Sequence, residues 1–126
     1  MTESCPFCYV SQDRIQYEDP YCFVVSDGFP VSNGHSLIIS KRHIGSFFES
    51  SEEEREALLR AIEQTKIRLD REFSPDAYNI GINDGAEAGQ TIPHLHIHLI
   101  PRYQGDDPDP RGGIRRVIPS KAVYWE

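Results

Sequence analysis

The sequence predicts an α+β protein in which a roughly five-stranded antiparallel sheet is covered by one long helix, with short helical segments besides. Five short segments have the residue types of strands, and two of them, 77–82 and 94–100, also alternate in the period of a strand. One longer segment repeats its apolar residues every three or four positions, as a helix does. We expect residues 1–126 to form a single domain, with 1–14 as an N-terminal segment and 104–126 as a C-terminal extension.

The first strands are predicted close together near the N-terminus. Residues 15–19 and 21–27 meet at an Asp-Pro pair, and a hairpin is the simplest arrangement. Residues 28–34 are rich in Gly, Pro, Ser and Asn and are expected to form a loop. A third strand is predicted at 35–40, so this loop would deliver His35 to a strand start.

A long helix is predicted from Ser51 to just before Ser74-Pro75. Ser51 and Glu54, three residues apart, match a capping box, and the acidic first turn suits the N-terminal end of the helix dipole. Pro75 disfavours helix at the residue before it. The predicted buried face carries apolar or small residues at helical spacing: Leu58, Ala61, Ile62, Thr65 and Leu69.

Two further strands are predicted on either side of a loop. Residues 77–82 alternate Tyr78, Ile80 and Ile82 as a fourth strand. The loop at 83–89 is made of small residues, and its glycines would let backbone N–H groups approach a ligand closely.

The last predicted strand, 94–100, carries histidine at every second position. Alternation places His94, His96 and His98 on one face, above an apolar layer on the other. Imidazole changes its charge near neutral pH and offers a nucleophilic or metal-binding nitrogen. Three of the five histidines in one row indicate a functional site. The alternative is a solvent-facing strand with incidental histidines.

Composition excludes several classes of function. The net charge of −7 repels polyanions, so we expect no DNA or RNA wrapping, and any phosphate must be held locally. No apolar stretch approaches the roughly 18 residues that cross a bilayer, and the N-terminus lacks the layout of a secretion signal. Three cysteines, an odd number, fit a reducing compartment. We expect a soluble, cytoplasmic protein with no membrane partner.

The triad and several neighbouring motifs resemble the histidine triad (HIT) superfamily of nucleotide hydrolases and transferases. Residues 94–100 fit its His-apolar-His-apolar-His-apolar-apolar signature. Other landmarks of the superfamily occur in the same order, at residues 34–39, 41–43, 83–85 and 89–91. The resemblance covers roughly residues 5–103 and implies a HIT-like fold.

The resemblance also implies a mechanism. His96 would attack the α-phosphorus of a nucleotide and form a nucleotidylated histidine that water hydrolyses, which divides one hard displacement into two easier ones. His98 would donate to the non-bridging oxygens. His94 completes the triad, and Thr91 and Gln90 match the positions that meet the leaving group and the phosphate.

Other positions match the nucleotide-binding residues of the superfamily. Asp27, eight residues before His35, matches the acid that accepts from both ribose hydroxyls, although a turn residue is the plain alternative. His35 would orient the triad or merely cap a strand end. Asn83 would contact the phosphate bridge, and Gly89 belongs to a matched landmark. The base contacts of this family are mostly apolar, and three side chains are candidates for such a pocket or for ordinary core: Phe7, Phe23 and Leu37.

A zinc site is predicted at the N-terminus. Cys5 and Cys8 have the spacing of one half of a tetrahedral site. The resemblance implies His43 and His94 as the other ligands, as in many bacterial members, and a closed, structural site. A redox pair or two ordinary thiols are the alternatives. Cys22 is expected to be a small buried apolar residue.

We therefore expect an enzyme that cleaves nucleoside 5′-phosphate derivatives, with adenosine or another purine, at the α-phosphorus. Dinucleoside polyphosphates, as in the Fhit-type branch, are favoured by Thr91 and by Pro101-Arg102. The alternatives are a Hint-like purine nucleoside phosphoramidase and a nucleotide-binding protein with little turnover. The superfamily generally forms homodimers, and two terminal aromatics, Tyr124 and Trp125, are plausible interface residues. Three arginines are candidates for holding distal phosphates or are simply solvated: Arg111, Arg115 and Arg116.

Overall fold

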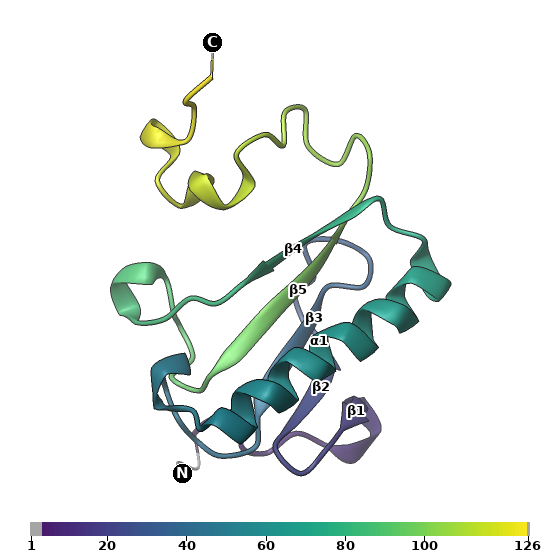
Figure 1. Ribbon diagram of the computed structural model, residues 1–126, viewed down its shortest axis with the longest axis vertical. Coiled ribbons are helices and arrows are strands. Elements are labelled where there is room, and N and C mark those ends of the chain that lie inside the picture. The colour runs from purple at the N-terminus through teal and green to yellow at the C-terminus, as the bar shows by residue number, and fades with distance from the viewer. Residues whose placement is uncertain (1–3, 126) are drawn as a thin grey trace.

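The computed structural model describes residues 4–125 and contains a five-stranded antiparallel sheet with one long helix (Figure 1). The strands are β1 (Ile15–Glu18), β2 (Cys22–Ser26), β3 (Ser36–Ser40), β4 (Ala77–Gly81) and β5 (His96–Arg102). Their order across the sheet is β1-β2-β3-β5-β4, and every neighbouring pair is antiparallel. The predicted fold class is confirmed.

The sheet order places the histidine strand, β5, in the interior. It pairs with β3 on one side and with β4 on the other. His98 lies opposite Leu37 of β3 and Gly81 of β4, and His96 lies opposite Ile39. A strand with both edges hydrogen-bonded holds its side chains at defined positions, so the two histidines stand on a rigid support.

Helix α1 (Glu52–Phe73) begins and ends as predicted. Ser51 Oγ accepts from the Glu54 N–H at 3.1 Å, and Glu54 Oε1 accepts from the Ser51 N–H at 2.7 Å. The helix stops at Ser74, whose φ of 49° is left-handed. Pro75, with no N–H and a bulky ring, follows and prevents continuation.

The helix α1 packs across one face of the sheet against β2 and β3 (Figure 1). The layer between them is formed by Cys22, Val24, Ile38, Leu95, Ile97 and Leu99 of the sheet side and by Ala57, Leu58, Ala61 and Leu69 of the helix. Burying an aliphatic side chain of this size contributes about 1.5–3 kcal/mol. Of the predicted helix face only Ile62 is incompletely buried. No helix in the described part is long and apolar enough to cross a membrane.

The opposite face of the sheet is covered by the two ends of the chain. Over β1 to β3 lies a second apolar cluster of Phe23, Val25, Leu37 and Ile39 with Phe7, Val10 and Ile15. Beyond β4 lies the C-terminal extension, with 3-10 helices at Gly113–Val117 and Pro119–Lys121 (Figure 1). His96 and His98 stand on this face, between the two.

The strand boundaries differ from the prediction near the histidines. β5 begins at His96 rather than at His94, because Pro93 has no N–H to enter a ladder. Leu95 instead donates to the Ile44 carbonyl at 2.7 Å. His94 is therefore placed just ahead of the strand and fully buried.

The remaining differences lie at strand ends and at the sheet edge. β1, β2 and β4 are each shorter than predicted, and β3 starts at Ser36, so His35 precedes it. Tyr78 of β4 and Ile82 just after it pack against the core, but Ile80 is 54% exposed. β4 is an edge strand, and alternation alone did not reveal that.

Candidate functional site

His96 presents an unprotonated nitrogen to the open face of the sheet. Its Nδ1 lies 2.7 Å from the carbonyl oxygen of His94, and a carbonyl only accepts, so Nδ1 carries the proton of the neutral ring. Nε2 is then the free base. The ring is held against Phe7 in an edge-to-face contact with centroids 5.0 Å apart. Such a nitrogen is available as a nucleophile.

His98 has the opposite proton arrangement. The Val31 N–H donates to His35 Nδ1 at 3.1 Å, so neutral His35 carries its proton on Nε2. That Nε2 lies 3.0 Å from His98 Nδ1 and donates to it. His98 must then carry its own proton on Nε2. A backbone N–H thus acts through two imidazoles to make His98 a donor.

Burial keeps both imidazoles of this pair neutral. Desolvation lowers the pKa of His35 and of His98, and for His98 the neighbouring His96 and His35 lower it further. Asp27 Oδ2 lies 3.3 Å from His35 Nε2 and opposes the shift in both rings. The neutral forms assumed in the proton arrangement therefore dominate near pH 7.

Asp27 fills the turn role that the sequence left open, and its second carboxylate oxygen faces His35. Its Oδ1 accepts from the Phe29 N–H at 2.8 Å, as a turn residue does, while its Oδ2 faces His35. A carboxylate has about four acceptor sites, so acceptance from ribose hydroxyls remains open to it. The ribose contact stays a prediction.

The loop before the triad is closed by Gln90. Its Oε1 accepts from the Gly85 N–H at 2.8 Å, and its Nε2 donates to the carbonyls of Gly45 and Ile92. The Gln90 amide is therefore used to shape the loop. Its predicted contact with phosphate stays a prediction.

The other predicted loop residues are brought to the surface. Asn83, Gly89 and Thr91 are exposed. The left-handed φ of 98° at Gly89 suits glycine, and its N–H donates to the Ala86 carbonyl. Asn83 lines a cavity together with His98. Phe7 meets the site through His96, and Phe23 and Leu37 belong to the apolar cluster beside it.

Four predicted metal ligands come together at the N-terminal end of the site. Cys5, Cys8, His43 and His94 form a cluster whose ligand atoms all lie within 4.8 Å of one another. Four individual separations are 3.1 Å (Cys8–His43), 3.1 Å (His43–His94), 3.4 Å (Cys5–His94) and 3.6 Å (Cys8–His94). Ligands of a tetrahedral zinc ion at ordinary bond lengths lie about 3.3–3.8 Å apart. The spacing fits a tetrahedral ion.

The protonation of His94 also fits a metal. His94 Nε2 lies 2.7 Å from the Ser40 carbonyl oxygen and donates to it, which leaves Nδ1 unprotonated and facing the two sulfurs. Metal-bound imidazoles commonly donate their other N–H to a carbonyl in this way. The donor set of two thiols and two imidazoles is that of a structural zinc site.

His43 is positioned by an ion pair next to it in the chain. Arg42 donates to both oxygens of Glu54, at 3.1 and 2.8 Å, at the start of α1. The hydrogen bond from Arg42 is the main reason that the pKa of Glu54 falls to about 2. The segment carrying His43 is thereby tied to the helix N-terminus.

A second group of possible ligands, Asp27, His35 and His98, also has all its ligand atoms within 4.8 Å of one another but differs in protonation. A metal bound between the facing atoms needs His35 Nε2 without its proton. The Val31 N–H occupies Nδ1, so the proton has to be on Nε2. This cluster fits a hydrogen-bonded relay and does not fit a metal ion.

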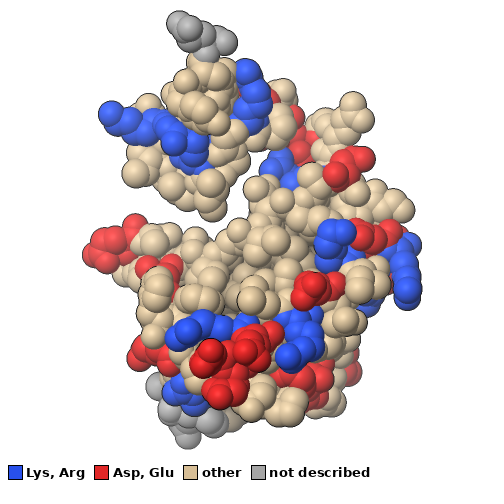
Figure 2. All heavy atoms as spheres, in the orientation of Figure 1, with Lys and Arg blue, Asp and Glu red and all other residues tan. Residues whose placement is uncertain are grey.

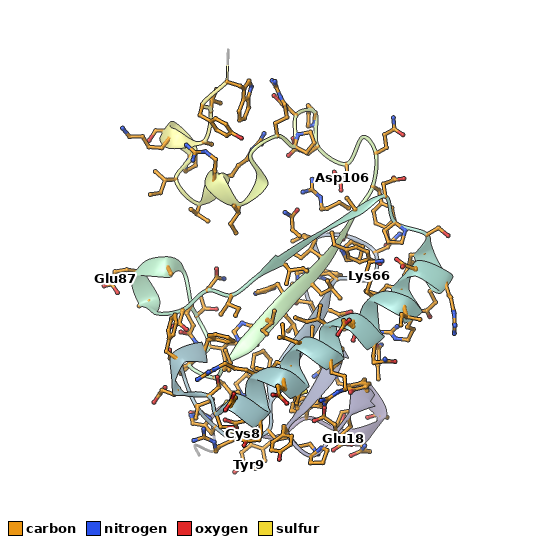
Figure 3. The ribbon with its side chains drawn as sticks, in the orientation of Figure 1. Cys8, Tyr9, Glu18, Lys66, Glu87 and Asp106 are labelled. Carbon is orange, nitrogen blue, oxygen red and sulfur yellow. The ribbon has the colours of Figure 1, made fainter. Side chains whose placement is uncertain are left out.

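A cavity of about 580 Å³ adjoins the relay, between β4, β5 and the C-terminal extension. His35, His98 and Asn83 lie in its walls, so it is continuous with the site. In Figure 3, Cys8 lies at the lower end of the molecule and Asp106 lies in its upper half, below the extension. Asp106 lines the cavity and Cys8 belongs to the metal cluster, so the two features flank the triad.

The arginines of the extension have partners within it. Arg111 lies 4.4 Å from the ring centre of Trp125 and pairs with Asp109. Arg115 donates to the carbonyl of Ala122 at 3.0 Å and lies 4.6 Å from the Tyr124 ring. These contacts fold the extension on itself. Only the third arginine of the set, Arg116, lines the cavity.

Sequence reasoning missed two groups of residues. The backbone N–H of Val31 and carbonyl of Ser40 decide which histidine nitrogens carry protons, and a main-chain group leaves no signature in side-chain chemistry. The cavity walls contributed by Ile80, Ile114 and Val117 were also missed. The one signal available in the sequence was the presence of apolar residues, such as Ile114 and Val117, in the otherwise polar C-terminal extension.

Comparison with known proteins agrees with this geometry. A family model of the HIT domain matches residues 9–105. The crystal structure of a HIT family protein from Bacillus anthracis superposes with a TM-score of 0.77 at 31% identity, over 85% of this chain and 79% of that chain. The adenylylsulfatase HINT3 of Arabidopsis thaliana is 34% identical over 110 residues, 84% of this chain and 56% of that protein. The asymmetrical bis(5′-nucleosyl)-tetraphosphatase of Schizosaccharomyces pombe is 38% identical over 77 residues, 61% of this chain and 42% of that protein.

The family match covers the sheet, the helix and all three triad histidines. It leaves out Cys5 and Cys8 at one end and the folded part of the extension at the other. With the fold, the triad strand and the sequence match in agreement, the chain belongs to the HIT domain family of nucleotide hydrolases and transferases.

Proposed function

We propose that this HIT-domain protein hydrolyses dinucleoside polyphosphates of the diadenosine tetraphosphate type at an α-phosphorus, through a nucleotide bound covalently to His96. The observation that carries this proposal is the opposite protonation of two neighbouring rings. His96 has a free Nε2, and His98, with its ring centre 5.3 Å away, has a protonated Nε2. One ring is a nucleophile and the other is a donor.

The reaction follows from this pair in two displacements. His96 Nε2 forms a bond to the α-phosphorus as the bond to the leaving polyphosphate oxygen breaks, and the leaving oxygen takes a proton from water. A water molecule then attacks the same phosphorus, loses its proton to solvent, and releases a nucleoside monophosphate with Nε2 restored. His98 Nε2–H donates to a non-bridging oxygen as charge builds there, which is worth about 2.7–4 kcal/mol for one such donor.

The remaining predicted site residues take binding roles. Asp27 accepts from the ribose hydroxyls, and the cluster around Phe7 and Leu37 packs against the base. Asn83 meets the phosphate chain, and Thr91 meets the leaving group, from the loop shaped by Gln90 and Gly89.

Two relatives support different substrates. The tetraphosphatase of Schizosaccharomyces pombe, 38% identical over 61% of this chain, supports the dinucleoside polyphosphate. The adenylylsulfatase of Arabidopsis thaliana supports an adenylyl group on a small leaving group, and a Hint-like phosphoramidase would use the same nucleophile. A nucleotide-binding role with little turnover is the outcome if neither is cleaved.

We also propose that the Cys/His cluster holds a structural zinc ion. Bound zinc would supply a rigid link between the N-terminal segment and the sheet. Cys5 and Cys8 flank Phe7, whose ring contacts His96, so the link would also hold one wall of the nucleotide site.

A homodimer is the proposed assembly. β4 pairs only with β5 in the described part of the chain, so its outer edge is open. Tyr124 of the extension is 71% exposed, which suits its predicted interface role. Trp125 instead packs under Arg111. Light scattering of the purified protein, at twice the mass of one chain, tests this.

The function is tested by following release of AMP from diadenosine tetraphosphate and from an adenosine phosphoramidate. We expect faster cleavage of the tetraphosphate, no turnover by His96→Ala, and a nucleotide adduct on the wild-type chain by intact-mass spectrometry after acid-free quenching. Preference for the phosphoramidate would establish the alternative. Full activity of His96→Ala would refute the nucleophile.

A further inference from the structure

The cavity beside the relay is built by the C-terminal extension. The 3-10 helix Gly113–Val117 forms one wall, and residues of β4 and β5 form the other. Figure 2 shows the hollow between the extension and the body of the molecule. Its volume of about 580 Å³ is in the range of small-molecule sites, about 300–1,000 Å³. A substrate held at His98 therefore has a partly enclosed space next to it.

The charged groups of the lining cancel one another. Arg102 Nη2 lies 2.8 Å from Asp106 Oδ1, and Arg116 Nη1 lies 3.6 Å from Asp107 Oδ2. Burial keeps the other titratable side chains there, the imidazoles of the relay, neutral. Because each arginine already has a carboxylate partner, the cavity does not favour a phosphate. It suits an uncharged group.

The walls have two apolar sides. Ile100, two residues after His98, lies on the sheet side, and Ile114 and Val117 lie on the side of the extension. Ile114 and Val117 are 67% and 72% exposed, so a ligand packed against them removes apolar surface from water. A planar ring with two apolar faces fits between such opposed walls.

Hydrogen-bonding groups lie among these apolar residues. Asn79 Oδ1 accepts from Arg102 Nη1 at 2.6 Å, which orients the Asn79 amide in the wall. The Asn83 amide, on the side of the triad, has no hydrogen-bond partner within residues 4–125. A nucleobase has apolar faces and polar edges, and it satisfies both kinds of wall. The amine of a phosphoramidate, if it carries only apolar groups, would leave these polar side chains without hydrogen bonds.

We propose that this cavity receives the second nucleoside of a dinucleoside polyphosphate, with the phosphate chain passing from His98 along Asn83. The inference rests on the proposed function and deepens it, because it requires a substrate with a nucleoside at each end. The extension that forms the outer wall lies largely outside the family match at 9–105. The second-nucleoside site is thus a property of this chain's own extension.

The test fills the cavity and compares it with an equal change outside it. Val117→Trp places an indole in the cavity, and Val123→Trp places one on the same extension, at a residue of similar exposure that does not line the cavity. The quantity measured is the ratio of kcat/KM for diadenosine tetraphosphate to kcat/KM for the adenosine phosphoramidate. We expect this ratio to fall at least tenfold in Val117→Trp and to stay within twofold of wild type in Val123→Trp.

A binding measurement separates failure of this site from failure of the hydrolase. In a His96→Ala background, calorimetry compares the affinities for diadenosine tetraphosphate and for AMP, with and without Val117→Trp. Tetraphosphate affinity weakened tenfold relative to AMP supports the site even if wild type has no turnover. The proposal would be overturned if Val117→Trp changed the affinities for both ligands equally or changed neither. It would also be overturned if the variant weakened binding of a phosphoramidate with an aromatic amine and left binding of the tetraphosphate unchanged. If neither nucleotide binds, both proposals fail.

Discussion

Two clusters in this protein bring potential metal ligands equally close, yet only one is arranged for a metal. In the Cys/His cluster, His94 donates its Nε2–H to the Ser40 carbonyl and turns a bare nitrogen inward. In the relay of Asp27, His35 and His98, the Val31 N–H donates to the unprotonated Nδ1 of His35, so the protonated Nε2 of His35 faces the cluster. One carbonyl and one N–H of the main chain make the difference.

The comparison shows why proximity of ligand-type residues is a weak criterion for a metal site. An imidazole is a donor at one nitrogen and an acceptor at the other, and the partner of the outer nitrogen decides which one faces the cluster. The same rule makes His96 a base and His98 a donor. A test of either cluster is therefore also a test of the proton arrangement that underlies the proposed chemistry.

The largest effect is expected from removing the metal ligands. Cys5→Ser and Cys8→Ser should each abolish binding of one zinc ion per chain, whereas Asp27→Asn should leave it unchanged. Zinc that binds only the folded chain stabilises it by about 4 kcal/mol when the free zinc concentration is 1,000 times the dissociation constant. Metal content by atomic emission and thermal unfolding with and without a chelator measure both.

Cys22→Ala is the matched control for that pair, because Cys22 is a buried cysteine of β2 outside the cluster. It should keep its zinc while losing some packing stability. Zinc content that falls with Asp27→Asn, or that survives Cys8→Ser, would contradict the contrast between the clusters.

The next largest effect is expected from His98. His98→Ala removes the donor to the developing charge and should lower kcat/KM by about 100- to 1,000-fold. His98→Gln offers an amide N–H and should recover part of this loss. Steady-state AMP release measures it, with zinc content as a check on folding. A loss below tenfold in His98→Ala would show that the ring is not the donor.

A smaller effect is expected from His35, which acts as a positioning residue through His98. His35→Leu breaks the relay and should cost about 10- to 100-fold, the usual loss for a partner that orients a functional imidazole. His35→Gln can accept from the Val31 N–H through Oε1 and donate to His98 through Nε2, so it should retain most activity. Equal losses in both variants would argue for packing instead of proton placement.

The parts of the fold predicted from sequence are those set by local patterns. The capping box of Ser51 and Glu54, the stop before Pro75 and the apolar face of the helix all depend on residues a few positions apart. The start of β5 was predicted two residues early, and the exposure of Ile80 at the sheet edge was not predicted, because both depend on neighbours distant in sequence. A period gives the face of a strand but not its place in the sheet.

The candidate site divides in the same way. The predicted ligands Cys5, Cys8, His43 and His94 were expected from the motif and its resemblance, and the structure brings them together. Which ring nitrogen of each histidine carries the proton could not be predicted, because main-chain groups of other segments determine it. The cavity was also beyond prediction, since its outer wall comes from an extension whose sequence departs from familiar branches.

The smallest effect concerns pH. Burial lowers the pKa of His35 and His98 in the folded chain, with Asp27 as the opposing charge, so below the ordinary pKa of 6.5 the unfolded chain binds protons that the folded chain does not. This contribution to the free energy of unfolding is fully present above pH 6.5. It is lost as the pH drops, by on the order of 1 kcal/mol between about pH 7 and pH 5. His35→Gln removes one titrating ring but keeps the metal cluster, so its unfolding free energy should fall less steeply over the same range. Identical slopes for both chains would mean that His35 does not need to be neutral in the fold, and the relay would lose its basis.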